Sequence, residues 1–191
     1  MNSSCGLCER VTIESLRVEA PDIRAEWMVT ARVIGALPDA LRRAQAVFEK
    51  TGGLHAAGLF EQFGALELIA EDVGRHNAVD KIVGRMLLDE RLRLGQSILF
   101  VSGRTSYEIV QKAFLAGIPV VGAVSAPSSL AVELAEGMGI TRSASCAAPR
   151  STCTRPGGVW PAESRSANAS TIRVDSAVNR CCLSRRNWPR G

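Results

Sequence analysis

Two cysteines lie close together near the start of the sequence, Cys5 and Cys8 in the segment SSCGLCERVT (3–12). Such a C-x-x-C pair can act as a redox dithiol, as half of a zinc site, or as a sulfur-transfer site in which one thiolate carries sulfane sulfur and the second thiol assists. A zinc site usually has a second close pair of ligands, and no second C-x-x-C or H-x-x-x-H follows. A thioredoxin-type dithiol normally lies between a strand and a helix, whereas only four residues precede Cys5. The spacing alone leaves the three chemistries open.

Three polar loops carry most of the other candidate site residues, and His55 lies in the Gly-rich stretch TGGLHAAGLF (51–60). The segments EDVGRHN (71–77), SGRTS (102–106) and SAPSS (125–129) each follow an expected strand and lead into an expected helix. In a parallel sheet such loops lie together at the carboxyl edge, and helix N-termini favour anions there. Arginine adds bidentate positive charge. Each loop alone could be an ordinary capped turn, but three together predict a pocket for a ligand that carries phosphate or pyrophosphate. Its candidate residues are His55, Arg75, His76, Ser102, Arg104, Ser125 and Ser128.

The elements that would position these residues follow from the apolar pattern. Strand patterns occupy 15–20, 65–74, 96–102 and 118–125, and a further element begins within 51–60. Helix patterns occupy 37–50, 74–87, 103–117 and 126–139. Successive strand–loop–helix units predict an α/β layered domain with parallel strands.

Several residues are expected to begin or end these helices. Pro38 suits a first turn, and Asn77 is expected to be the N-cap of the helix over 74–87. Thr105 and Glu108 fit a capping box for the helix over 103–117, and Gly117 fits its C-cap.

The charge of the chain differs between the residues before and after about Thr141. The net charge is +4, but residues 142–191 contain nine Arg, no Lys and two acids, so this tail is +7 and the rest is −3. The tail has no sustained helix or strand period and is expected to be mostly irregular. The domains expected are a C-x-x-C segment (1–14), an α/β domain (15–141) and a basic tail (142–191).

The composition also restricts the function classes. No run of 18 apolar residues and no secretory signal is present, so we expect no membrane association and a cytoplasmic location. Aromatic residues are few and not interleaved with the basic ones, so a nucleic-acid partner is not expected. A disulfide framework does not fit a chain without a secretory signal, and no protein-bound metal is expected.

Six segments, taken in their order along the chain, resemble one protein family. The segments are CGLC (5–8), TGGLHAAGLF (51–60), EDVGRHNAVDKIVG (71–84), SGRTSYEIVQKA (102–113), AGIPVV (116–121) and SAPSSLAVELAEGMGIT (125–141). Together they resemble the formate dehydrogenase accessory sulfurtransferase family, FdhD, over residues 5–141.

The resemblance implies a specific activity. Cys5 matches the family's persulfide cysteine and Cys8 its partner thiol. The family accepts sulfur from a cysteine desulfurase and passes it to bis-molybdopterin guanine dinucleotide, the molybdenum cofactor that enters formate dehydrogenase. Its domain resembles the cytidine deaminase fold, a three-layer α/β/α sandwich. The guanine nucleotides and pyrophosphates of that cofactor agree with the expected anion pocket. A homodimer is left open.

Three alternatives accompany this interpretation. The chain could be a cofactor-binding or guanine-nucleotide-binding chaperone without sulfur transfer, an inactive truncated fragment of the family, or a deaminase. A zinc deaminase needs H-x-E followed by P-C-x-x-C, whereas this chain has His55-Ala56-Ala57 and an upstream C-x-x-C.

Both ends of the chain depart from the family pattern. Family members carry a sizeable portion before the C-x-x-C, and after GIT (139–141) they continue with an apolar strand and a Gly-Phe-x-Arg-like stretch. Here the sequence changes to RSASCAAPRSTC (142–153). We expect a frameshift near Thr141, with a lineage-specific extension as the alternative.

Overall fold

The structure is a computed structural model of the whole chain. It describes the backbone of residues 23, 25–92 and 94–145, and of four short segments at 151–152, 154–155, 158–159 and 171–175. Side chains are described between residues 23 and 140, except at 24, 26 and 93. The C-x-x-C pair, the strand expected at 15–20 and most of the tail lie outside these residues.

A mixed sheet forms the centre of the described part. Its strands lie in the order β3-β2-β4-β5-β6-β7. The bounds are β2 His55–Glu61, β3 Leu66–Asp72, β4 Ser97–Arg104, β5 Val120–Ser125, β6 Thr141–Ser145 and β7 Ser151–Thr152. A second sheet pairs β1 (Glu26–Thr30) with β10 (Thr171–Asp175), and a third pairs β8 (Thr154–Arg155) with β9 (Gly158–Val159).

The strand directions correct part of the sequence prediction. Strands β4, β5 and β6 are parallel, as predicted, but β2 is antiparallel to both β3 and β4. The reason is a short hairpin between β2 and β3, in which Gly64 takes a φ of 88° and its N–H bonds to the carbonyl of Glu61 at 2.8 Å. Because two antiparallel pairings restore the direction, β3 still points the same way as β4. The ends of β3, β4 and β5 therefore lie at one edge of the sheet.

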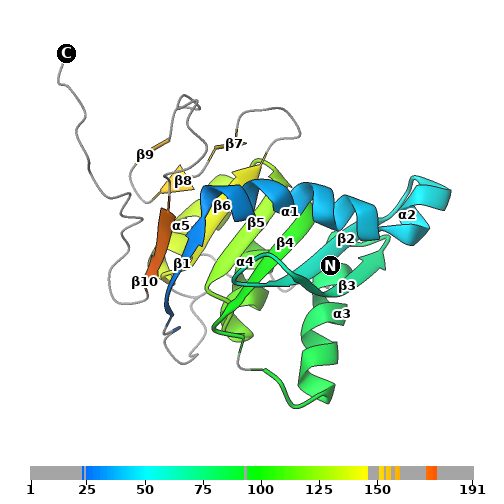
Figure 1. Cartoon of the computed structure of the whole chain (residues 1–191), viewed down its shortest axis with the longest axis horizontal. Coiled ribbons are helices and arrows are strands. Elements are labelled where there is room, and N and C mark those ends of the chain that lie inside the picture. Colours follow the sequence, from blue (N-terminus) through cyan, green and yellow to red (C-terminus); the bar gives the residue numbers. More distant parts are fainter. Residues whose placement is uncertain are drawn as a thin grey trace, which may run out of the picture.

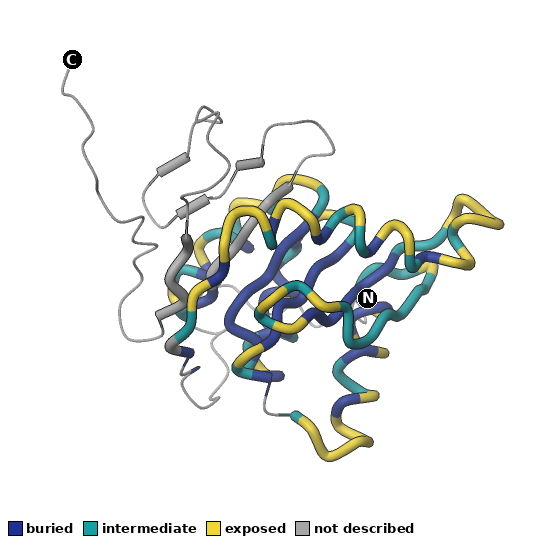
Figure 2. Tube along the Cα trace, viewed as in Figure 1, coloured by how far each residue is buried: buried dark blue, intermediate teal, exposed yellow. Residues whose placement is uncertain are grey.

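Helices cover both faces of this sheet (Figure 1). Helix α1 (Ala31–Ala44) lies across one face and is followed by α2 (Ala46–Thr51), whereas α3 (Arg75–Leu88), α4 (Tyr107–Leu115) and α5 (Ser129–Gly137) lie on the other. The burial pattern follows these layers, because β2, β4 and β5 are mostly dark blue in Figure 2, the strand β3 is teal, and much of the outer helix surface is yellow. The expected three-layer α/β arrangement is therefore present in the described residues.

Helix α1 begins earlier than its sequence pattern predicts. Thr30 is its N-cap, and its hydroxyl accepts a hydrogen bond from the N–H of Val33 at 3.2 Å. Pro38 consequently lies inside the helix, and its expected place in a first turn is wrong. The backbone leaves the helical conformation at Gln45, so the predicted helix over 37–50 is divided between α1 and α2.

The other helix ends are partly as predicted. Gly74, not Asn77, is the N-cap of α3, and α4 begins after Ser106 because β4 continues through Arg104. Gly117 has the φ of 73° typical of the residue after a helix C-cap, and it bonds back to the carbonyl of Phe114 at 2.9 Å.

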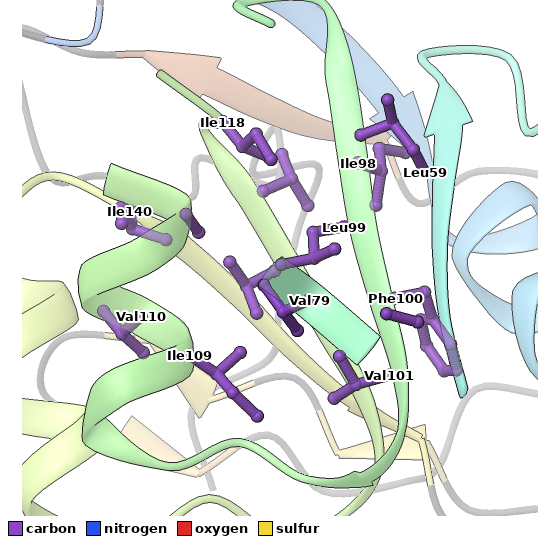
Figure 3. Packing of buried hydrophobic residues seen from close by; sticks show 14 of the residues in the cluster. Leu59, Val79, Ile98, Leu99, Phe100, Val101, Ile109, Val110, Ile118 and Ile140 are labelled. Carbon is purple, nitrogen blue, oxygen red and sulfur yellow. The ribbon is translucent and has the colours of Figure 1, made fainter. Parts of the chain in front are cut away.

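The core includes residues on both faces of β4, which lies between the two helix layers. Figure 3 shows Val79 of α3 next to Leu99 of β4, with Ile109 and Val110 on α4 beside them. On the α1 face, Phe100 has a glycine as its partner on each neighbouring strand, Gly58 on β2 and Gly122 on β5. A Cβ at Gly122 would lie 2.4 Å from a Phe100 ring carbon, so the absence of a side chain makes room for the ring.

The tail contributes strands that the sequence pattern does not predict. Strand β6 crosses the boundary expected between residues 141 and 142 and extends the parallel part of the sheet. Strand β10 pairs in register with β1, with Glu26 opposite Asp175. No helix among the described residues is long and apolar enough to cross a membrane.

Candidate functional site

The candidate site residues of the described domain lie at one edge of the central sheet. This edge is formed by the ends of β3, β4 and β5 and by the start of β2. The strand register places His55 opposite Asp72, and Arg104 opposite Ser125. The predicted convergence of the three loops is therefore present in the fold, although one strand of the sheet runs the other way.

Gly103 lies at the centre of one part of this edge. A Cβ on Gly103 would be 3.5 Å from Nδ1 of His55 and 3.7 Å from Cδ of Arg75. The imidazole of His55 on β2 and the aliphatic part of the Arg75 side chain on α3 thus both approach the backbone of Gly103. The chain places two nitrogen-rich side chains together here, and a Cβ at residue 103 would lie in ordinary van der Waals contact with both.

His76 forms the second part of the edge, and its ring nitrogen Nε2 has three polar neighbours. Arg75 donates from Nε to this nitrogen at 3.3 Å, the Ser106 hydroxyl lies 2.9 Å away, and a carboxylate oxygen of Glu108 lies at 3.6 Å. All these groups come from the first turns of α3 and α4 or the residue before α4. Whether the Ser106 hydroxyl or the ring nitrogen donates this hydrogen bond depends on the tautomer of the ring.

The surroundings of His76 and Glu108 change how readily each takes up a proton. Partial burial lowers the pKa of His76, and the positive charges of Arg75 and Lys112 lower it further, against an opposing effect of Glu108. Burial raises the pKa of Glu108, but hydrogen bonds from its own backbone N–H and from Ser106, with the charge of His76, bring the net pKa below its ordinary value. Neutral His76 beside ionised Glu108 is the state favoured near neutral pH.

The predicted serines have mainly structural partners. Ser102 accepts a hydrogen bond at Oγ from the N–H of Ala56 at 2.8 Å, where the regular β2–β4 ladder ends. Ser128 caps α5, because its Oγ accepts from the N–H of Ala131 at 3.2 Å. Its own N–H donates to the carbonyl of Thr105 at 3.1 Å, which ties the second and third loops together.

Arg75, Arg104 and Ser125 are the residues of this edge whose polar groups are best placed to contact a ligand. Arg104 and Ser125 are exposed and face each other in the β4–β5 register. Neither Arg75 nor Arg104 forms an ion pair with a carboxylate among the residues whose side chains are described. Both guanidinium groups are therefore suited to bind an anion such as a phosphate.

The sequence prediction missed several residues of this edge. Asp72 accepts hydrogen bonds from the N–H of Gly74 at 2.8 Å and from Asn77 at 3.1 Å, and it pairs with Lys81 at 2.6 Å. These partners, Lys81 first, lower the pKa of Asp72 to about 2. Ser106 was also missed, although the short run Thr105, Ser106, Glu108 does signal a helix start there.

The arrangement does not match a hydrolytic triad. Ser106 and Glu108 both face Nε2 of His76, whereas a triad needs its carboxylate on the other ring nitrogen. Among the side chains that the structure describes, no group of three or more His, Cys, Asp or Glu is arranged to hold a metal ion. The edge instead combines arginine and imidazole groups with helix N-termini, and its carboxylates Asp72 and Glu108 already have partners. Its arginines and helix N-termini suit an anionic ligand.

Cys5 and Cys8 lie outside the described residues, so their distance from this edge is not given by the structure. Their roles as persulfide cysteine and partner thiol stay predictions.

Comparison with known proteins identifies a matching family and several relatives that share one name. The model of the FdhD/NarQ family matches residues 1–153. A protein named "Sulfur carrier protein FdhD" from Thermoplasma acidophilum is 52% identical over 141 residues, covering 74% of this chain and 50% of that protein. Proteins of the same name from Streptomyces coelicolor and Mycobacterium tuberculosis are each 53% identical, covering 73% of this chain and 50% and 51% of their own lengths. The chain thus spans about half the length of these curated relatives.

A solved structure shares the fold. The crystal structure of a protein assigned as a formate dehydrogenase accessory protein from Desulfotalea psychrophila superposes with a TM-score of 0.58 at 29% sequence identity. The match covers 75% of this chain and 58% of the other. With the family model matching most of the sequence and relatives at about half identity, the chain belongs to the FdhD/NarQ family.

Proposed function

We propose that this chain is a sulfur carrier that acts in the maturation of formate dehydrogenase. The observation that carries the proposal is that relatives named as sulfur carriers share about half of the residues over the very segment that builds the sheet-edge site. The proposed reaction makes the chain a sulfurtransferase, with Cys5 as the acceptor of sulfane sulfur and Cys8 as its partner thiol.

The first proposed step is uptake of sulfur from a cysteine desulfurase. The Cys5 thiolate attacks the terminal sulfur of the desulfurase persulfide, a new S–S bond forms on Cys5, and the desulfurase cysteine leaves as a thiolate. The sulfur keeps its oxidation state in this exchange, so no external oxidant or reductant is needed.

The second proposed step delivers the sulfur to the molybdenum cofactor, bis-molybdopterin guanine dinucleotide, as the bound substrate. Attack of the Cys8 thiolate on the Cys5 sulfur releases hydrosulfide and leaves a Cys5–Cys8 disulfide, so the thiol pair supplies both electrons. The hydrosulfide then becomes a ligand of the molybdenum, and the disulfide is reduced by cellular thiols before the next cycle.

The sheet edge is the proposed binding surface for the cofactor's nucleotide and pyrophosphate groups. Arg75 and Arg104 would bind phosphate oxygens through their guanidinium groups, and His55 and His76 would donate from ring nitrogens when the ligand is bound. Ser125 has an exposed hydroxyl, while Ser102 and Ser128 support the loops through the bonds described above. Support for this assignment comes from the absence of ion-pair partners for both arginines within the described residues.

A likeness to the cytidine deaminase fold is part of the same proposal. It is supported by the mixed sheet with helices on both faces, and it implies no deaminase activity. The position where a zinc deaminase needs its glutamate is Ala57, a fully buried residue of β2. Superposition on solved deaminases would test this fold assignment.

A cofactor-binding chaperone without sulfur transfer is the second candidate. It is favoured by one observation, namely that the sheet edge is assembled without any cysteine among its described residues. A homodimer and a direct contact with formate dehydrogenase are proposed for either role.

The experiment that separates the two roles is mass spectrometry after incubation with a cysteine desulfurase and cysteine. The sulfur-carrier proposal expects the peptide that contains Cys5 and Cys8 to gain the mass of one sulfur atom, and Cys5→Ala to abolish the gain. No gain on the unmodified chain would contradict the sulfur-carrier role and leave the chaperone and the inactive fragment of the family as alternatives.

A further inference from the structure

The ring nitrogen Nε2 of His76 has more polar neighbours than it can bond at one time. Nε of Arg75, at 3.3 Å, can only donate, and the ionised carboxylate of Glu108, at 3.6 Å, can only accept. The Ser106 hydroxyl, at 2.9 Å, can do either. An imidazole nitrogen offers either one lone pair or one proton. The protonation of Nε2 therefore determines which of these neighbours it bonds.

Without a proton, Nε2 accepts the hydrogen of Arg75 Nε. This bond joins two adjacent residues at the start of α3 and occupies one donor of the guanidinium. The Arg75 stem then lies beside Gly103, where its Cδ is 3.7 Å from the position of a Cβ. The two terminal NH2 groups remain for a ligand. A bidentate contact through Nε and the neighbouring NH2 group is blocked, because Nε already has an acceptor.

With a proton, Nε2 becomes a donor, and only Ser106 and Glu108 can accept from it. The Ser106 hydroxyl also donates to the Glu108 carboxylate. Ring, hydroxyl and carboxylate are therefore all bonded in this state without Arg75. The charged ring repels the guanidinium, and Arg75 Nε loses its acceptor. The whole guanidinium is then free to bind an anion.

The other charged groups near the ring already have partners of their own. Lys112 faces the ring from α4 and Asp80 faces it from α3, and these two residues form an ion pair with each other. Asp72, at the end of β3, pairs with Lys81. The one further titratable group near the guanidinium is His55 on β2, whose Nδ1 also approaches Gly103. Among the described side chains, the guanidinium itself has no ion pair.

We propose that His76 is a positioning residue that controls Arg75 through its own proton: the neutral ring holds Nε of Arg75, and the protonated ring releases it for an anion. The anion-binding part rests on the function proposed above, whereas the exchange of partners at Nε2 does not. Anion binding through Arg75 should therefore become stronger as the pH falls through the midpoint of His76.

Nitrogen NMR of the unmodified chain tests the exchange without any ligand. Above the midpoint of His76, Nε2 is expected to be the ring nitrogen without a proton. The Nε signal of Arg75 is expected to shift with the same midpoint as the His76 ring. Arg85 is the internal control, because its Nε donates to Asp89 at 2.9 Å, and its signal should not follow that midpoint. A neutral ring with its proton on Nε2, or a constant Arg75 signal, would overturn the proposal.

Three variants identify the imidazole that Arg75 follows. Glu108→Gln should lower the midpoints of the His76 ring and of Arg75 Nε together, because it removes a carboxylate that favours the protonated ring. His76→Gln supplies an acceptor that does not titrate, so the Arg75 transition should disappear. His55→Gln is the matched control, because it removes the other imidazole near Arg75, and the transition should remain. A transition that is lost in His55→Gln and kept in His76→Gln would contradict the assignment.

Sulfate is the probe for the anion, because its charge is constant over the range in which His76 titrates. The loss of sulfate affinity caused by Arg75→Ala should be about three times larger or more below the midpoint than above it, the effect of one hydrogen bond gained. In the His76→Gln background this loss should be the same at both pH values. A loss independent of pH in the unmodified chain would overturn the release of Arg75 for an anion. Neither Cys5 nor the molybdenum cofactor takes part in these measurements, so a failure of the sulfur-carrier proposal is distinguishable from a failure of this one.

Discussion

At the scale of single residues, the site depends on what surrounds His76. Arginine, serine and carboxylate groups all approach one ring nitrogen, so the protonation state of that nitrogen depends on all three neighbours. The neutral ring can accept from Arg75, and the protonated ring can donate to Ser106 or Glu108. Charge at this edge of the sheet therefore changes with modest changes in pH.

The titration of His76 gives the first prediction. Its pKa is expected below the ordinary value of 6.5, chiefly because of partial burial. Glu108→Gln should lower the pKa of His76 further, because it removes the negative charge that opposes the shift. Lys112→Gln should raise it, because it removes a positive charge. Ring signals followed against pH by NMR measure both variants, and shifts of the same sign would contradict this electrostatic account.

Binding of a guanine nucleotide gives the second prediction, with guanosine diphosphate as the probe for one end of the cofactor. Arg75→Ala and Arg104→Ala should each weaken binding about tenfold to hundredfold, the range expected for one charge-assisted hydrogen bond. Arg85→Ala is the control, because Arg85 lies in the last turn of α3 and pairs with Asp89. Calorimetric titration measures the affinities. An equal loss in all three variants would indicate that only overall charge matters.

At the scale of the elements, the Gly58–Phe100–Gly122 row sets how closely the strands and α1 pack. Phe100 is fully buried, and its ring occupies the space that a side chain at residue 122 would need. The glycines therefore determine where the end of β4 lies, and with it Ser102 and Gly103.

Substitution of these glycines gives the third prediction. Gly122→Ala should lower the free energy of unfolding by about 1–3 kcal/mol, because its Cβ would overlap the Phe100 ring. Gly84→Ala is the matched control, because Gly84 lies inside α3 with open space around it. That variant should raise the free energy of unfolding by about 0.5–1 kcal/mol. Urea unfolding measures both, and a stabilising Gly122→Ala would show that the row is not close-packed.

Much of this element scale could be predicted from the sequence, for identifiable reasons. Strands β4 and β5 are short apolar runs bounded by glycine and polar residues, which is a strong local signal. The direction of β2 depends on the hairpin at Gly64, and the segment FEQFGALE (60–67) gives only a weak turn signal for it. The start of α1 is difficult to predict, because Pro38 is typical of a first helical turn and indicates a later start than the Thr30 N-cap.

The site shows the same division between local and long-range information. The location of the three loops at one edge of the sheet could be predicted from the order of the elements alone. The hydrogen bonds that Glu71 accepts from the N–H groups of Val47 and Phe48 in α2 could not be predicted. Val47 and Phe48 lie 24 and 23 positions before Glu71 in the sequence, and no local pattern connects them. The surroundings of Gly103 could not be predicted either, because the side chains of His55 and Arg75 approach it from other elements, β2 and α3.

At the scale of the whole molecule, several ionisable groups link stability to pH in the same direction. Asp72, Glu108 and His76 all have pKa values below their ordinary values in the folded chain. The unfolded chain therefore binds protons first as the pH falls, and the free energy of unfolding decreases.

The fourth prediction follows from these shifts. The His76 contribution to stability should be lost as the pH falls through about 6.5, and that of Asp72 between about 4 and about 2. Asp72→Asn should remove the most acidic part of this dependence. Urea midpoints measured from about pH 7 downwards test the sign. A midpoint that rises on acidification would contradict it.

The most direct test of the central claim is formate dehydrogenase activity in a strain that lacks its own family member, supplied with this chain or with Cys5→Ala at matched protein levels. Arg85→Ala serves as a neutral variant, since Arg85 lies outside the sheet-edge site. The sulfur-carrier account predicts that the unmodified chain and Arg85→Ala restore activity and that Cys5→Ala does not. Equal restoration by Cys5→Ala would contradict sulfur transfer on Cys5, and no restoration by the unmodified chain would contradict a carrier function for this chain.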